Sequence, residues 1–235
     1  MSRKPIIVFT TDDFFTTDYT ILYDQMRRRG WLWTAYVVGG RVGRGQLRGA
    51  YGDWGHLERL AQSGVDIQCH TLNHIDLSTL TRQEVADEIS GNTDRLMRRG
   101  FAKPEHHALP FGGYNQMVLD EVLKQRKTVR HTGASSNDWN TYEEVQSGIL
   151  KGLRADIKDD VYFETVKQGI DNAIANNGVL VLYHHEIMKG MIPDYKVMLG
   201  YLIKLHDYVE SKGISVMTMS EAYDYVIDTL ESEAA

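Results

Sequence analysis

Short apolar runs alternate with longer amphipathic segments along most of this chain. The apolar runs are rich in β-branched and aromatic residues and cover 6–9, 34–38, 65–69, 105–109, 128–132, 179–183 and 214–217. Segments with helical spacing of apolar residues cover 19–29, 54–62, 82–99, 115–125, 161–176, 195–212 and 220–230. This alternation predicts repeated βα units and a parallel sheet. We therefore expect an α/β fold, as a parallel barrel or an open doubly wound sheet.

The pattern shows no linker, low-complexity tract or internal repeat, which predicts one domain over residues 1–235. A chain of 235 residues with 42% hydrophobic and 25% charged residues suits a globular domain with a sizeable core. Residues 39–55 contain several Gly and Arg and predict a long loop over the carboxyl ends of the strands.

Charge and terminal sequence narrow the range of partners. A net charge of −6 argues against nucleic-acid binding, which depends on neutralising phosphates. No apolar run is long enough to span a bilayer, and the run after Met-Ser-Arg-Lys-Pro is too short for a signal sequence. We expect no nucleic-acid or membrane partner, and a location in the cytoplasm or in a larger particle such as a phage virion. Cys69 is the only cysteine, so no intrachain disulfide can form.

Polar residues with metal-binding and acid–base chemistry follow several of the predicted strands. Asp12-Asp13 follow the first strand, His70 and His74 the third, Asp138-Trp139 the fifth, and His184-His185 the sixth. Taken alone, an Asp pair is as often a helix cap, and two histidines are more often satisfied polar groups. The carboxyl ends of parallel strands meet at one face, however, and two imidazoles with a carboxylate suit a catalytic divalent metal. Together they favour a metal site.

Five segments in order resemble the motifs of the polysaccharide deacetylases of carbohydrate esterase family four, which include chitooligosaccharide and peptidoglycan deacetylases. The segments are Thr10-Thr11-Asp12-Asp13, His70-Thr71-Leu72-Asn73-His74, Pro110-Phe111-Gly112, Asp138-Trp139 and Leu182-Tyr183-His184. The second is a full match to the family's His-Ser/Thr-x-x-His. The resemblance implies a distorted (β/α)7 barrel.

By this resemblance, Asp13, His70 and His74 hold a divalent ion. Zn²⁺ is the simplest choice, and Co²⁺, Ni²⁺ or Fe²⁺ also suit such a donor set. Asp12 is implied as the general base that takes a proton from water.

The fourth and fifth motifs imply a general acid, His184, oriented by Asp138. A carboxylate partner favours the charged imidazole, which an acid near neutral pH requires. His185 is adjacent, and because strand residues alternate between faces only one of the two points into the barrel. The match to Leu-x-His selects His184, and a role for His185 stays open.

The implied partner is an acetylated glycan or oligosaccharide. The resemblance implies that its binding groove is built from residues of the third, fourth and fifth motifs: Pro110, Phe111, Gly112, Tyr114, Trp139 and Leu182. Aromatic faces suit the apolar face of a sugar ring, although each aromatic residue alone is more often part of a core.

Two departures from the family pattern stand out. Ala108 occupies the place of the third-motif arginine, which in the family pairs with the catalytic base. Residues that could replace it in space are His107, Arg130, Arg154 and Lys158. Phe14-Phe15 replace the usual Gly-Pro after the first motif and imply a reshaped or narrower groove.

The leading hypothesis is a metal-dependent hydrolase that removes acetyl groups, N-acetyl rather than O-acetyl, from a sugar in a polysaccharide or oligosaccharide. Two alternatives remain: an amide hydrolase of a small molecule, as in the allantoinase-like branch, and a non-catalytic glycan-binding protein on the same scaffold.

Overall fold

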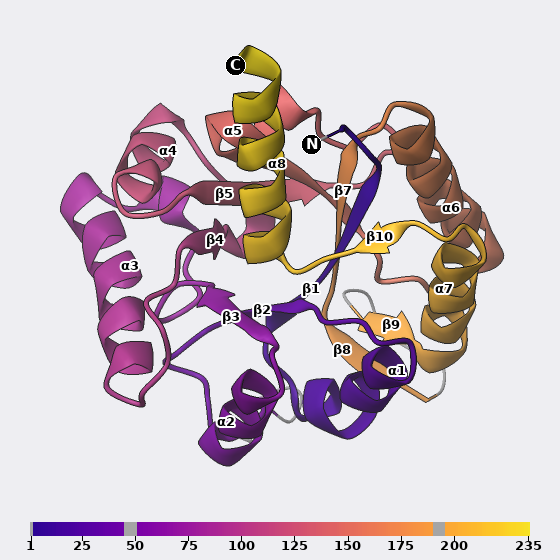
Figure 1. Ribbon diagram of the computed structural model, residues 1–235. Helices are drawn as coiled ribbons and strands as arrows, with labels where there is room; N and C mark the ends of the chain where they lie inside the picture. The colour runs from indigo at the N-terminus through magenta and orange to yellow at the C-terminus, as the bar shows by residue number, and fades with distance from the viewer. Residues whose placement is uncertain (1, 45–50, 190–195) are drawn as a thin grey trace.

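A closed parallel barrel of seven strands forms the centre of the molecule in this computed structural model, which describes residues 2–44, 51–189 and 196–235 (Figure 1). The barrel strands are β1 (Ile6–Asp13), β2 (Thr34–Val37), β3 (Asp66–Cys69), β4 (His106–Ala108), β5 (Thr128–Gly133), β6 (Ile149–Arg154) and β7 (Val179–His184). Each strand pairs with the next, and β7 pairs with β1 to close the ring. The predicted (β/α)7 barrel is confirmed.

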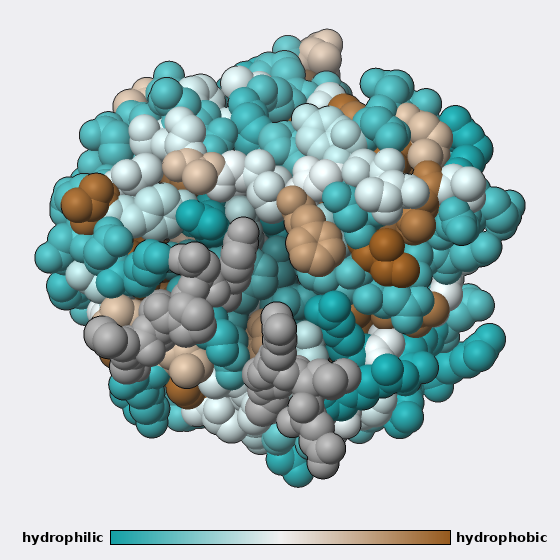
Figure 2. Space-filling model, turned by 180° about the vertical axis from the view of Figure 1, so that it is seen from behind, coloured by the Kyte–Doolittle hydropathy of each residue, from teal (hydrophilic) through white to brown (hydrophobic). Residues whose placement is uncertain are grey.

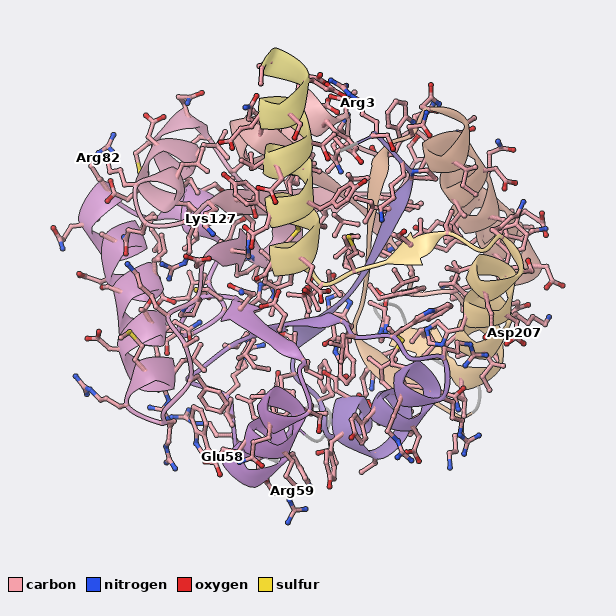
Figure 3. The ribbon with its side chains drawn as sticks, viewed as in Figure 1. Arg3, Glu58, Arg59, Arg82, Lys127 and Asp207 are labelled. Atoms are coloured by element: carbon pink, nitrogen blue, oxygen red, sulfur yellow. The ribbon has the colours of Figure 1, made fainter. Side chains whose placement is uncertain are left out.

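Helices surround this ring (Figure 1). They are the π-helix η1 (Asp18–Leu22), α1 (Tyr23–Arg28), α2 (Trp54–Gln62), the 3₁₀ helix η2 (Leu77–Thr79), α3 (Arg82–Met97), the 3₁₀ helix η3 (Pro110–Gly112), α4 (Gln116–Leu123), α5 (Tyr142–Ser147), α6 (Asp160–Ala175), α7 (Leu199–Ser211) and α8 (Met219–Ala234). Within the described part of the chain, no helix has both the length and the apolar composition to cross a bilayer. Charged side chains such as Arg59, Arg82 and Asp207 lie at the periphery (Figure 3).

Side chains of β1 alternate between two apolar clusters. Ile7 and Phe9 belong to the larger cluster, together with residues of α6 and α7. Ile6 and Val8 belong to a second cluster with residues of β7 and α8. Because α8 packs against the residues that begin β1, it covers the amino-terminal end of the barrel (Figure 1). The carboxyl ends of the strands are therefore the face available for a site.

The register fixes which side chains share the barrel interior. Thr10 and Asp12 of β1 pair with Thr34 and Tyr36 of β2. On the other side of β1, Thr10 pairs with Tyr183 of β7. Paired residues of parallel strands point to the same face, so a polar layer lies above the apolar floor of the barrel.

Two elements were missed, and one predicted strand was assigned the wrong place in the sheet. The sequence pattern missed α5 and β6, because Ile149-Leu150-Lys151-Gly152-Leu153-Arg154 places Lys and Gly in the middle of the strand. The segment 214–217 was expected as the seventh barrel strand, but only Ser215–Val216 form β10, which pairs with the first residues of β1. The strand that completes the barrel of seven is therefore β6, and not the segment 214–217.

The loop predicted over 39–55 is described only in part. Residues 45–50 lie outside the described residues, as does Tyr195 at the start of the predicted helix 195–212, and α7 begins at Leu199. Two short strands, β8 (Glu186–Met188) and β9 (Lys196–Met198), pair in parallel beyond the end of β7.

Candidate active site

Asp13, His70 and His74 bring their donor atoms together at the carboxyl end of the barrel. One donor atom from each lies within 4.8 Å of the others. His74 Nε2 is 3.2 Å from Asp13 Oδ1, and His70 Nε2 is 4.0 Å from the same oxygen. These three side chains could hold a divalent cation, as the sequence predicted.

A hydrogen bond from the ring orients His70, and a hydrogen bond from the backbone holds the loop at His74. His70 Nδ1 donates to the carbonyl oxygen of Ala108 at 2.8 Å, which leaves the Nε2 lone pair facing Asp13. The backbone N–H of His74 donates to Thr71 Oγ1 at 3.0 Å. Burial lowers the pKa of both imidazoles to about 4, so both are neutral and can act as ligands near pH 7.

Left-handed backbone conformations concentrate at this site. Among the described non-glycine residues, φ is 75° at Asp13, 64° at Phe14, 64° at Thr71, 59° at His74 and 59° at Phe111. Such angles disfavour side chains with a Cβ atom and persist only where the surrounding structure imposes them. They turn the chain abruptly after β1 and within the His70–His74 loop.

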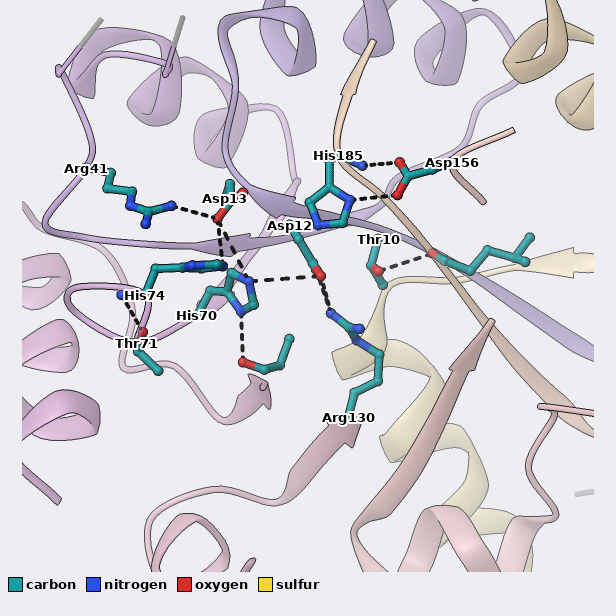
Figure 4. A network of polar contacts seen from close by, with 12 residues as sticks. Thr10, Asp12, Asp13, Arg41, His70, Thr71, His74, Arg130, Asp156 and His185 are labelled. Carbon is teal, nitrogen blue, oxygen red and sulfur yellow. Dashed lines mark hydrogen bonds and ion pairs between the residues drawn. The ribbon is translucent and has the colours of Figure 1, made fainter. Parts of the chain in front are cut away.

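Asp12 points into the barrel and pairs with Arg130 of β5 (Figure 4). Arg130 Nη2 lies 2.6 Å from both carboxylate oxygens, and the side chains are 0% and 3% exposed. Burial raises the pKa of Asp12, but the neighbouring positive charges, that of Arg130 first among them, and the Arg130 hydrogen bond together outweigh burial and lower the pKa to about 2. The sequence named Arg130 as one of four replacements for the missing arginine, and the structure selects it.

A second acid–base pair consists of His185 and Asp156. His185 Nδ1 is 2.8 Å from Asp156 Oδ2, and the backbone N–H of His185 donates to Asp156 Oδ1 at 2.9 Å. Burial lowers the pKa of His185, but the Asp156 charge and hydrogen bond outweigh it and raise the pKa to about 9. The imidazole is therefore protonated at neutral pH and beside Asp12 (Figure 4).

The structure does not bring the predicted pair, His184 and Asp138, together. His184 Nδ1 donates to the carbonyl oxygen of His185 at 2.8 Å, and burial lowers the pKa of its imidazole. Asp138 Oδ2 instead accepts from the backbone N–H of Ser135 at 2.6 Å, within a local turn. Of the two adjacent histidines, the structure thus places His185 beside Asp12 and pairs it with a carboxylate (Figure 4).

Strand register explains why the sequence did not predict the pair of His185 and Asp156. His184 pairs with Thr11 of β1, so both point away from the barrel interior, which Asp12 faces. Asp156 follows β6, the strand that the apolar pattern did not predict. The one available signal was the alternation of faces along 179–185, which left the choice between His184 and His185 open.

A pocket of about 640 Å³ connects these groups. It is lined by the Asp13, His70 and His74 cluster, by Asp12 and His185, and by side chains of other strand ends and loops: Phe15, Tyr51, Leu109, Phe111, Thr132, Gly133, Ala134, Arg154, Tyr183 and Lys196. In the view from behind, the face of the molecule is hollowed near its centre, among largely hydrophilic surface (Figure 2).

Of the predicted groove residues, only Phe111 lines the pocket. It is 68% exposed, and its ring packs against that of His74 with centroids 4.6 Å apart. Pro110 and Leu182 are buried, and Tyr114 contacts His131. Trp139 packs against the core, and Gly112 lies against Thr132. These five contribute to the loops and core around the pocket and not to its surface.

Phe15 lines the pocket together with Tyr51 of the loop before α2. Phe15 and Tyr51 form an antiparallel bridge, and their rings stack at 5.2 Å. Phe14 is fully buried against Gly52, whose N–H donates to the Phe14 carbonyl at 3.0 Å. Of the aromatic pair, Phe15 therefore lines the pocket, whereas Phe14 is part of the core.

Solved structures with the same fold include several deacetylases. A family 4 carbohydrate esterase from Streptomyces lividans in complex with acetate superposes with a TM-score of 0.60 at 16% identity, covering 92% of this chain and 94% of that one. The peptidoglycan deacetylase PdaC from Bacillus subtilis, as the D285S mutant, gives 0.62 at 17% identity and covers 98% and 95%. At such identities the likeness concerns the fold.

Sequence comparisons point to the same group. Bacillus subtilis YxkH, which is named as a polysaccharide deacetylase, is 24% identical over 157 residues, covering 64% of this chain and 55% of YxkH. The chitooligosaccharide deacetylase of Bradyrhizobium sp. is 28% identical over 102 residues, covering 42% of this chain and 46% of that protein. The chain thus spans about half the length of the curated relatives it matches. The sequence profile of the polysaccharide deacetylase family matches residues 2–129, more than half of the chain, and the chain belongs to that family.

Proposed function

We propose that this protein is a metal-dependent hydrolase that removes acetyl groups, N-acetyl in preference to O-acetyl, from a sugar of a polysaccharide or oligosaccharide. The observation that carries the proposal is the presence in one pocket of three clustered metal-binding side chains, an ionised carboxylate and a protonated imidazole. Hydrolysis of an amide needs these functions: activation of water, a base and an acid. The relatives named above, which are called deacetylases, support the choice of an acetyl group.

The donor set fits a divalent ion held by Asp13, His70 and His74. Two neutral imidazoles and one carboxylate suit Zn²⁺, and also Co²⁺, Ni²⁺ or Fe²⁺. When bound, such an ion supplies Lewis-acid activation of water and of the acetyl carbonyl.

Asp12 and His185 then move the protons. Asp12 is ionised at neutral pH and takes a proton from the attacking water. His185 is protonated at neutral pH and gives its Nε2 proton to the departing sugar nitrogen, which leaves as an amine. Asp156 fixes the ring of His185 and stabilises its charge. Phe111 and the Phe15–Tyr51 pair provide apolar faces for a sugar ring.

Acetate release from chitooligosaccharides and acetylated bacterial glycans, measured with metal-stripped protein reloaded with Zn²⁺ or Co²⁺, tests the proposal. We expect turnover that depends on added metal. The absence of acetate release from every acetylated glycan, with metal bound, would contradict it.

The adjacent histidines provide a matched test of the acid. His185→Asn keeps a donor near Asp156 but removes Nε2, and we expect kcat to fall by about 100-fold or more. His184→Asn keeps the donor to the His185 carbonyl, and we expect turnover within about threefold of the unmodified protein, since the ring does not line the pocket. The reverse order of losses would restore His184 as the acid.

A further inference from the structure

Arg130 stands one strand away from the position where the family resemblance places its arginine. In the parallel pairing of β4 and β5, Ala108 lies directly opposite Arg130. Paired residues share a face, so both side chains start toward the barrel interior, about 4.8 Å apart around the ring. The chain thus carries the arginine on the neighbouring strand β5. The residue opposite it on β4, Ala108, has only a methyl group as its side chain.

The barrel is built to accommodate Arg130. Its side chain is 0% exposed, and its guanidinium carbon lies 4.4 Å from the centre of the Tyr183 ring and 5.4 Å from that of Tyr36. On β6, a Cβ atom at Gly152 would come within 2.4 Å of Arg130 Cδ. Small residues on both flanking strands, Ala108 and Gly152, therefore leave the space that the long side chain fills.

The distance to His70 alone does not distinguish the two adjacent aspartates as ligands, although only Asp13 also lies near His74, whose Nε2 is 3.2 Å from Asp13 Oδ1. His70 Nε2 lies 4.0 Å from Asp12 Oδ2 and also 4.0 Å from Asp13 Oδ1. The difference lies in their partners. Arg130 Nη2 holds both oxygens of Asp12 at 2.6 Å, whereas Asp13 Oδ1 has no hydrogen-bond partner among the described residues and has Arg41 Nη1 only at 3.6 Å.

We propose that Arg130 is the positioning residue that keeps Asp12 out of the metal's ligand set, so that Asp13 is the ligand and Asp12 stays available as the base. The inference rests on the proposed function for the base role, but the ligand selection concerns only this chain and a divalent ion. Without Arg130, the Asp12 carboxylate is free to turn toward the same ion as Asp13. The site would then gain a ligand and lose its base.

Arg130→Met tests this directly, with Co²⁺ as the probe. We expect Co²⁺ to bind about tenfold more tightly than to the unmodified protein, with weaker visible absorption, because an added oxygen ligand raises the coordination number. Adding Asp12→Asn to Arg130→Met should return the affinity and spectrum to those of the unmodified protein, and it also removes the unpaired buried carboxylate. An unchanged Co²⁺ affinity and spectrum in Arg130→Met would overturn the proposal.

A relocated arginine gives the second test and covers the case in which Arg130→Met does not fold. The double variant Ala108→Arg/Arg130→Ala restores the arginine on β4. We expect the folded variant to show the Co²⁺ spectrum of the unmodified protein and at least about a tenth of its kcat, with KM unchanged, since only the base has been re-anchored. A folded relocated variant with an altered spectrum would overturn the proposal.

The Co²⁺ measurements need no substrate. If the unmodified protein released no acetate from any glycan, the proposed function would fail, while the spectra would still decide whether Arg130 selects the ligand.

Discussion

Asp156 binds His185 at two points, through Oδ1 to the backbone N–H at 2.9 Å and through Oδ2 to Nδ1 at 2.8 Å. The double contact fixes both the end of the strand and the orientation of the ring. The ring held in this way lines the pocket. One carboxylate thus both positions the imidazole and favours its protonated form.

Replacing Asp156 should move the alkaline limb of the pH profile. In the unmodified protein, kcat should fall as pH rises through about 9, where His185 loses its proton. Asp156→Asn removes the largest contribution that opposes burial, and burial lowers the pKa of an imidazole. We expect the limb to move down by more than about one pH unit. Kinetics from pH 6 to 10 measure it, with Asp138→Asn as a control that should leave the limb in place.

Divalent metal should stabilise the fold through the three clustered ligands. At a free Zn²⁺ concentration about 100 times the dissociation constant, binding to the folded state alone adds about 2.7 kcal/mol. Thermal unfolding should therefore shift upward with Zn²⁺, and His74→Ala should abolish the shift. His56→Ala is the control, because His56 stacks on Tyr19 away from the pocket. An equal shift in all three proteins would indicate that Zn²⁺ binds elsewhere.

Gly52 should not tolerate a methyl group. A Cβ atom there would lie 2.3 Å from Cε1 of Phe14, a fully buried ring that cannot move aside without disturbing the core. We expect Gly52→Ala to lower the free energy of unfolding by about 1–3 kcal/mol. Gly200→Ala, where a Cβ atom would meet nothing within 4 Å, should not destabilise the protein. Urea denaturation of the two variants makes the comparison.

His206 should limit stability in acid. Both ring nitrogens lack a partner among the described residues, and the ring packs edge-on against Phe9 at 5.0 Å. Burial lowers its pKa to about 3, below the 6.5 of an exposed histidine. Because the folded protein resists protonation of this ring, its contribution to the free energy of unfolding is fully present above pH 6.5. That contribution is lost as the pH falls from 6.5 toward 3.

His206→Phe removes that proton linkage. At pH 5 we expect it to recover about 2 kcal/mol of the stability that the unmodified protein loses relative to pH 8. Chemical denaturation at the two pH values measures the difference. Parallel loss of stability in both proteins would show that another group governs the acid transition.

The spacing of apolar residues and the sequence motifs together predicted the fold class and much of the candidate site. The apolar alternation gave the α/β class, and Asp12-Asp13 with His70 and His74 lie together as predicted, because all four belong to strand ends of one barrel face. Local sequence could not decide between His184 and His185. That choice depends on which face of β7 meets Asp12, and hence on the register between strands far apart in the chain.

Arg130 and Asp156 were harder to find for a related reason. Each contacts a residue more than 25 positions away in the chain, and no short spacing links the partners. Asp156 also follows a strand that is interrupted by Lys151 and Gly152, so no apolar run marked its place. Partnerships of this kind arise from the closed ring and not from neighbouring sequence.

The left-handed residues around the pocket have a consequence for binding. Five non-glycine residues there, Asp13, Phe14, Thr71, His74 and Phe111, hold backbone angles that cost about 1 kcal/mol or more each. The rest of the fold bears that cost before any ligand arrives. A site that is already bent into shape needs less of a ligand's binding free energy to organise itself, so more of that free energy remains available for a reaction.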